Sequence, residues 1–175
     1  MGSVIVVRVG RVADDIIDPI GGAVSACFQL PVQLAGEPLD PEFAYHAGRQ
    51  QYWSTPMLHE LETRAAAPGD RVLGVADVDL FVPVFTFVFG EALLRRPPAV
   101  ISLSRLRPTF YGLPDDPELT LERAAKEAIH ELGHTFGLVH CADYGCVMHV
   151  SRVADEIELK GRDFCPACAG RLGQT

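Results

Sequence analysis

The first third of the chain alternates apolar runs with segments of helical periodicity. Residues 3–10 are rich in Val and Ile and predict a buried strand, and residues 15–30 carry apolar side chains at roughly helical spacing. A short strand is expected at 32–34. Residues 37–51 are rich in proline, polar and aromatic residues, so we expect a loop or hairpin there. The first third of the chain is therefore predicted to form a strand, a helix and a second strand, in that order.

The middle of the chain predicts a second helix followed by strands. Residues 56–67 have helical character, with Thr55 as a plausible N-cap, Pro56 at the first helical position and the Pro68-Gly69 pair as the stop. Three runs rich in Val, Phe, Leu and Ile predict further strands: 71–78, 86–91 and 99–103.

A long helix is predicted after the proline-rich loop 105–119, with Thr120 as its N-cap. Its apolar residues recur at three- and four-residue spacing and would face the sheet: Leu121, Ala125, Ala128, Leu132 and Phe136. Glu127, His130 and His134 occupy another face. This helix can therefore form core on one side and the floor of a cleft on the other.

These elements predict an α/β (α+β) fold, a mixed twisted sheet with packed helices and parallel neighbours early in the chain. We expect one domain over residues 1–175. The composition changes after His140, which suggests an N-terminal subdomain at 1–140 and a small C-terminal subdomain at 141–175. The 35 residues of the C-terminal subdomain can bury only a small hydrophobic core. This subdomain therefore needs additional stabilisation, such as a disulfide or a bound metal ion.

Charge and hydropathy narrow the function classes. The chain has 175 residues, 48% of them hydrophobic, and a formal net charge of −8. A negative balance works against binding to nucleic acid or to anionic membranes. The longest apolar run, 80–89, is about half of a membrane span. Residues 1–9 lack the features of a signal peptide, so we expect a cytoplasmic protein, and we expect it to be a monomer.

Candidate chemistry is concentrated in residues 130–140, His-Glu-Leu-Gly-His-Thr-Phe-Gly-Leu-Val-His. His130 and His134 lie four apart, so a helix places both imidazoles on one face. Gly137 can take positive φ where the helix ends, which turns the chain and brings His140 round as a third ligand. Three neutral histidines leave the fourth position of a zinc ion open for water.

Glu131 and Met148 complete this pattern. Glu131 projects beside the metal without being needed as a ligand, so we expect it to act as general base for a metal-activated water. Met148, a short distance after the third histidine, is expected in a turn that gives the imidazoles an apolar floor. His-Glu-x-x-His-x-x-Gly-x-x-His with a downstream Met is the motif of the metzincin zinc peptidases.

Four of the five cysteines fall in the last 35 residues: Cys141, Cys146, Cys165 and Cys168. In a reducing compartment this clustering suggests metal before disulfides, and four thiolates form a closed tetrahedral zinc site. Two disulfides or an iron centre are the alternatives. In this sequence the histidine motif is followed directly by the cysteine pattern. In this order of motifs the chain resembles one metzincin family, the archaemetzincins or archaelysins. The resemblance implies a second, structural zinc bound by the four cysteines.

The resemblance implies a zinc metallopeptidase with a metzincin-like fold, a hydrolase that acts on peptides or unfolded proteins and carries two Zn²⁺ per chain, one catalytic and one structural. Such a fold would place residues 86–91 as the edge strand above the cleft, where an extended substrate could pair with it. Core packing is an equal explanation for Phe87 and Phe89. Aminopeptidase and endopeptidase action stay equally open, because the sequence displays neither a pocket for a substrate amine nor a cleft open at both ends. The alternative is a catalytically silent module that binds zinc and captures peptides. The metal ligands do not discriminate between enzyme and module, because both retain them.

Overall fold

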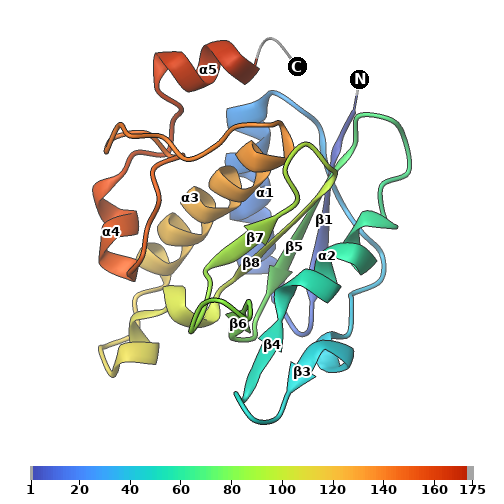
Figure 1. The fold of residues 1–175 in the computed structure, drawn as a ribbon, viewed down its shortest axis with the longest axis vertical. Coiled ribbons are helices and arrows are strands. Elements are labelled where there is room, and N and C mark those ends of the chain that lie inside the picture. The colour runs from blue at the N-terminus through green and yellow to red at the C-terminus, as the bar shows by residue number, and fades with distance from the viewer. Residues whose placement is uncertain (1, 173–175) are drawn as a thin grey trace.

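A twisted five-stranded sheet forms the centre of the fold in the computed structural model, which describes residues 2–172 (Figure 1). The strand order is β2-β1-β5-β8-β7. The strands are β1 (Val4–Val9), β2 (Val32–Leu34), β5 (Arg71–Ala76), β7 (Gly90–Ala92) and β8 (Pro98–Ser102). All neighbours are parallel except β7, which pairs antiparallel with β8 at the edge. The predicted mixed sheet with early parallel neighbours is therefore confirmed.

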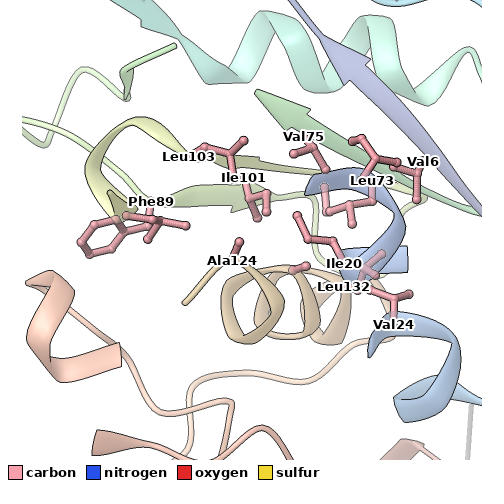
Figure 2. Packing of buried hydrophobic residues seen from close by; sticks show 14 of the residues in the cluster. Val6, Ile20, Val24, Leu73, Val75, Phe89, Ile101, Leu103, Ala124 and Leu132 are labelled. Atoms are coloured by element: carbon pink, nitrogen blue, oxygen red, sulfur yellow. The ribbon is translucent and has the colours of Figure 1, made fainter. Parts of the chain in front are cut away.

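Helices cover both faces of this sheet. On one face α1 (Asp14–Phe28) and α3 (Pro117–Thr135) lie side by side, and α2 (Ser54–Glu62) covers the other (Figure 1). Figure 2 shows side chains of α1 and α3 packing against Leu73, Val75 and Ile101 of the central strands. The alternate residues of the same strands pack under α2. Burial on both faces explains why the central strands are continuous Val, Leu and Ile runs.

Shorter elements complete the chain. A three-stranded sheet consists of β3 (Tyr45–His46), β4 (Gln51–Trp53) and β6 (Leu80–Phe81), in the order β3-β4-β6. Three 3₁₀ turns connect the larger elements: Pro41–Ala44, Ser104–Leu106 and Pro108–Tyr111. Two short helices follow α3: α4 (Ala154–Leu159) and α5 (Pro166–Leu172). Within the described residues, no helix is long and apolar enough to cross a membrane.

The predicted bounds of the second helix were wrong at both ends. It begins at Ser54, so Thr55 is a helical residue, and the hydroxyls of Ser54 and Thr55 both donate to the Glu91 carboxylate of β7. It ends at Glu62 instead of Ala67. The backbone N–H of Ala67 donates to Asp70, 2.8 Å away, which holds this segment in a loop. The predicted signals at Thr55 and at the Pro68-Gly69 pair therefore do not mark the ends of this helix.

Two further boundaries differ from prediction. The helix α3 begins at Pro117, because the side chain of Asp116 accepts a hydrogen bond from the Leu119 N–H at 2.9 Å, so the N-cap is Asp116 and not Thr120. Of the predicted strand 86–91, only its end belongs to β7. Arg49 Nη2 donates to the Thr86 carbonyl at 3.1 Å, the Val88 N–H donates to the Leu80 carbonyl of β6, and the Phe89 carbonyl accepts from the Ser102 N–H of β8. Residues 86–89 are therefore a loop that contacts β6 and β8, and they do not belong to β7.

Candidate metal centre

The C-terminal half of α3 positions two imidazoles on one face. The helix extends through Thr135, and Gly137 follows with φ of 91°, the conformation expected for a sharp turn. The chain then doubles back, since the Leu138 N–H donates to the Gly133 carbonyl at 3.0 Å. This turn brings His140 to His130 and His134, and one nitrogen of each ring lies within 4.8 Å of the others. The structure thus brings together the three histidines that the sequence singled out.

Backbone carbonyls orient the two helical imidazoles. His130 Nδ1 is 2.8 Å from the Val147 carbonyl, and His134 Nδ1 is 2.8 Å from the Leu138 carbonyl. A carbonyl only accepts, so each Nδ1 carries the proton and each Nε2 presents a lone pair. The two Nε2 atoms are 3.2 Å apart. Ligands at about 2.0 Å on a tetrahedral zinc are separated by about 3.3 Å, so the pair matches the edge of such a site.

The electrostatics of the three histidines favour neutral ligands. Burial lowers the pKa of His130 well below its ordinary value, and burial also lowers the pKa values of His134 and His140. The buried Lys160 cation acts in the same direction on all three. Neutral imidazoles are the form that binds a metal ion, so no deprotonation opposes binding near neutral pH.

Glu131 lies between the two helical histidines in the sequence and lines the same cavity. Burial, followed by the charge of Glu127, raises the pKa of its carboxyl well above the ordinary value. The edge strand passes directly against it: a Cβ added at Gly90 would lie 2.6 Å from Glu131 Cγ and 2.8 Å from its Oε1. Only a residue without a side chain permits this approach.

The cavity has a volume of about 440 Å³. Its apolar lining comes from the loop before β7, and its polar lining from α3, His140 and the segment 150–152. The lining residues are Phe85, Thr86, Phe87, Val88, Phe89, Gly90, Glu127, His130, Glu131, His140, Val150, Ser151 and Arg152. This volume is within the range of small-ligand sites in proteins. The cavity is therefore the place where a substrate would meet the histidines.

Met148 packs beneath the metal-site helix and is fully buried. A Cβ added at Gly133 would lie 2.4 Å from the Met148 sulfur, so the thioether is pressed against the helix one residue before His134. The Met148 carbonyl accepts a hydrogen bond from the Cys141 N–H at 3.0 Å. The turn at Met148 is thereby tied to the residue that follows the third histidine.

The four C-terminal cysteines gather in a second cluster. The four sulfur atoms all lie within 4.8 Å of one another, and none of the four cysteines forms a disulfide: Cys141, Cys146, Cys165 and Cys168. Cys141 and Cys165 have their sulfurs 3.8 Å apart. Sulfurs at about 2.3 Å on a tetrahedral zinc would be separated by about 3.8 Å. The quartet fits a closed zinc site, and within the described residues no disulfide is formed.

The thiols of this cluster do not ionise alike. The Cys168 N–H donates to Cys165 and lowers the pKa of that thiol to about 7. Burial raises the pKa values of Cys146 and Cys168. Four thiolates crowded this closely repel one another, so a cation is required for all of them to be deprotonated.

Comparisons with known proteins show the family of the chain. The model of Peptidase family M54 matches residues 41–174. An archaemetzincin of Thermococcus kodakarensis is 37% identical over 98% of this chain and 96% of its own length. The chain belongs to peptidase family M54, the archaemetzincins.

Solved structures of the family share the fold. An archaemetzincin from Methanopyrus kandleri is 38% identical, with a TM-score of 0.84 over 99% of this chain and 94% of its own. A zinc-dependent peptidase from Methanocorpusculum labreanum has a TM-score of 0.89 at 29% identity, over 97% of this chain and 100% of its own. The protein is thus a zinc metallopeptidase with the metzincin-like fold that its motif predicts, and its substrates are peptides.

Sequence reasoning missed three residues of the site. Lys160 and Arg152 stand in polar stretches without periodic signal, and no pattern places them near the histidines. Gly90 had a signal: an isolated glycine in a strand pattern often marks close backbone approach. Of the histidines outside the motif, His149 lies nearest, with its Nδ1 2.8 Å from the Cys141 carbonyl.

Proposed function

We propose that the protein hydrolyses peptide bonds at His130, His134 and His140, with Glu131 as general base. The observation that carries this proposal is the convergence of the three ring nitrogens within 4.8 Å, beside a cavity that His130, His140 and Glu131 line. A zinc ion held there supplies Lewis acidity, which polarises a carbonyl and lowers the pKa of water toward about 7.

Glu131 moves the proton in the proposed reaction. Its carboxylate takes a proton from the attacking water, whose oxygen bonds to the substrate carbonyl carbon. It returns that proton to the nitrogen as the C–N bond breaks, so the leaving amine departs neutral. Burial raises the pKa of the Glu131 carboxyl, which makes its carboxylate a stronger base for taking that proton.

The four cysteines are proposed to hold a second zinc ion that has no open position for substrate. Its role is to staple the C-terminal segment, since five of the six members of its small apolar cluster come from that segment and the turn before it. The proposed stoichiometry is two zinc ions per chain. The single catalytic domain, with subdomains at 1–140 and 141–175, is part of the same proposal.

Met148 is proposed to support the histidines without binding metal. Its sulfur packs against Gly133 and its carbonyl holds Cys141, so it connects the helix with the start of the cysteine segment. A thioether is polarizable and excludes water, which keeps the imidazoles in a dry, rigid setting.

The test is to incubate zinc-loaded protein with a diverse peptide mixture and to identify fragments by mass spectrometry. Glu131→Ala is the matched variant, because it removes the proton carrier and retains every metal ligand. We expect fragments from the wild type and none from the variant at equal zinc content. Cleavage unchanged in Glu131→Ala, or absent in both proteins, would refute the proposal. Fragment termini also report whether the cuts are internal or at the N-terminus.

A further inference from the structure

The cavity beside the histidines contains one unpaired cation. Within the described part of the chain, Arg152 is the only lysine or arginine among its lining residues. The lining also includes two carboxylates, Glu127 and Glu131. Glu127 is already paired, because the Lys160 Nζ lies 2.9 Å from its Oε1. The charge available to a ligand is therefore set by Glu131, Arg152 and any metal ion held by the histidines.

The Arg152 head group has no partner among the described residues, and of the arginines in that state Arg152 alone lines the cavity. Its guanidinium makes no hydrogen bond or ion pair with any described residue. By contrast, Arg105 forms a two-pronged pair with Asp79, and Arg123 binds Glu158. The backbone of Arg152 is nevertheless anchored, since its N–H donates to Glu156 Oε2 at 2.6 Å. An anchored backbone with an unpaired guanidinium is suited to binding an external acceptor.

The wall contributed by Phe85, Phe87 and Phe89 defines what else the ligand needs. This wall is apolar, and Phe85 is 62% exposed at its rim. Such a surface accepts the methylene or aromatic part of a peptide, whereas a guanidinium prefers a carboxylate, which it binds through two parallel hydrogen bonds. The lining therefore matches a peptide segment that combines apolar surface with one carboxylate.

We propose that Arg152 makes the enzyme selective for peptides that place a carboxylate in this cavity, next to the bond that is cut. The carboxylate comes from an acidic side chain or from the C-terminus of the peptide. This inference rests on the proposed peptidase function and names the substrate class of that same site.

The net charge of the chain makes this preference distinctive. A protein of net charge −8 repels acidic peptides at long range. Without a local contact, a neutral peptide would bind as well as its acidic counterpart or better. Tighter binding of the acidic peptide would therefore indicate a short-range contact, because the net negative charge of the protein by itself would weaken the binding of that peptide.

The test measures binding without turnover, in zinc-loaded Glu131→Gln protein. Four fluorescent peptides share one apolar sequence, with Glu or Gln at a central position and a C-terminal acid or amide. Fluorescence anisotropy gives each Kd. We expect at least one carboxylate-bearing peptide to bind about tenfold tighter than the Gln amide, the factor for a charge-assisted hydrogen bond. Comparing the Glu amide with the Gln acid identifies the source of the carboxylate.

Arg152→Gln in the same background is expected to remove this preference, and Arg152→Lys to retain part of it. Arg11→Gln is the control, because Arg11 is exposed and lies outside the cavity, and it should retain the full preference. Equal affinity for all four peptides, or a preference that survives Arg152→Gln, overturns the proposal. Equal cleavage of acidic and neutral peptides by the wild type overturns it as well, while the peptidase function stands. If no peptide binds and no peptide is cleaved, both the proposed selectivity and the proposed peptidase function are refuted.

Discussion

The Lys160 ammonium lies 2.9 Å from the Glu127 carboxylate, and the two side chains are only 1% and 5% exposed. The Lys160 Nζ and the Glu127 Oε1 are not aligned for a hydrogen bond, so the attraction between them is electrostatic. The Lys160 Nζ donates instead to the His149 carbonyl at 3.1 Å. One buried cation thereby joins the metal-site helix to the residue that follows Met148. The proposed catalytic floor and the C-terminal segment are held together at this point.

Lys160→Met should destabilise the protein by about 3–5 kcal/mol, because it leaves the Glu127 charge buried without a partner. Urea unfolding at fixed zinc concentration measures the loss. The double variant Glu127→Gln with Lys160→Met should recover most of it, since no unpaired charge remains. Arg96→Met is the control: its pair with Glu62 is exposed and should cost less than about 1 kcal/mol. A double variant as unstable as Lys160→Met would contradict this account.

Gly90→Ala should slow catalysis and leave metal binding intact. The added Cβ would fall 2.6 Å from Glu131 Cγ and 2.7 Å from the Val100 carbonyl, so the Glu131 carboxylate must move. A displacement of about 1 Å at a reacting group can cost about 100-fold in rate. Steady-state kinetics should show this loss in kcat, with zinc content equal to wild type.

Gly22→Ala is the control for that substitution, because a Cβ at Gly22 meets nothing within 4 Å. Its kcat should equal that of the wild type. A Gly90→Ala enzyme with normal kcat would mean that Glu131 tolerates the shift, and the role assigned to Gly90 would be wrong.

Cys141→Ser should disturb both proposed metal sites. Cys141 directly follows His140, its N–H donates to the Met148 carbonyl at 3.0 Å, and its carbonyl lies 2.8 Å from His149 Nδ1. Loss of the thiolate should therefore lower zinc content from two per chain to below one, as measured by elemental analysis. Cys27→Ala serves as control and should retain two, since Cys27 lies outside the cysteine quartet. Retention of one zinc on intact histidines in Cys141→Ser would refute the coupling.

Asp70 should make stability depend on acid pH. Its carboxylate accepts hydrogen bonds from the Ser3 and Ala67 N–H groups, and these lower its pKa below the ordinary value of 3.8. A lowered folded pKa means that the stabilisation is complete above the unfolded value and is lost as pH falls through the folded one. Asp70→Asn should therefore reduce Tm at pH 7 and change it less at pH 3.

The control for Asp70→Asn is Asp15→Asn, an exposed residue of α1 without a hydrogen-bond partner among the described residues. Metal loss in acid affects both variants equally, so the difference between their Tm values isolates Asp70. A difference from Asp15→Asn that is the same at pH 3 and pH 7 would exclude this linkage.

Local patterns predicted the elements whose signal is a short repeat. The strand at 71–78 and the helix that bears His130 follow from apolar periodicity, and the turn at Gly137 follows from backbone sterics. The histidine spacing determines that two imidazoles share one face, because four residues are about one helical turn. These features need no knowledge of distant partners, so they were predictable.

Boundaries and supporting contacts depended on partners far away in sequence. The Ser54 hydroxyl at the start of α2 donates to Glu91, and Arg49 donates to the Thr86 carbonyl of the loop 86–89. Neither partner can be recognised from the local sequence pattern. An arginine or glutamate in a polar stretch is expected to be exposed to solvent, and only the folded structure shows what it contacts. The same holds for the buried Lys160 beside Glu127.

The sequence by itself therefore determined the fold class and the placing of His130 and His134 on one helix face, because helical spacing and alternation of apolar residues are properties of a few neighbouring positions. Only the tertiary structure decided what surrounds Glu131. The bare backbone of Gly90, the paired charge of Glu127 and the free guanidinium of Arg152 reach the cavity from separate segments. Their meeting is the product of long-range packing, which no local pattern encodes.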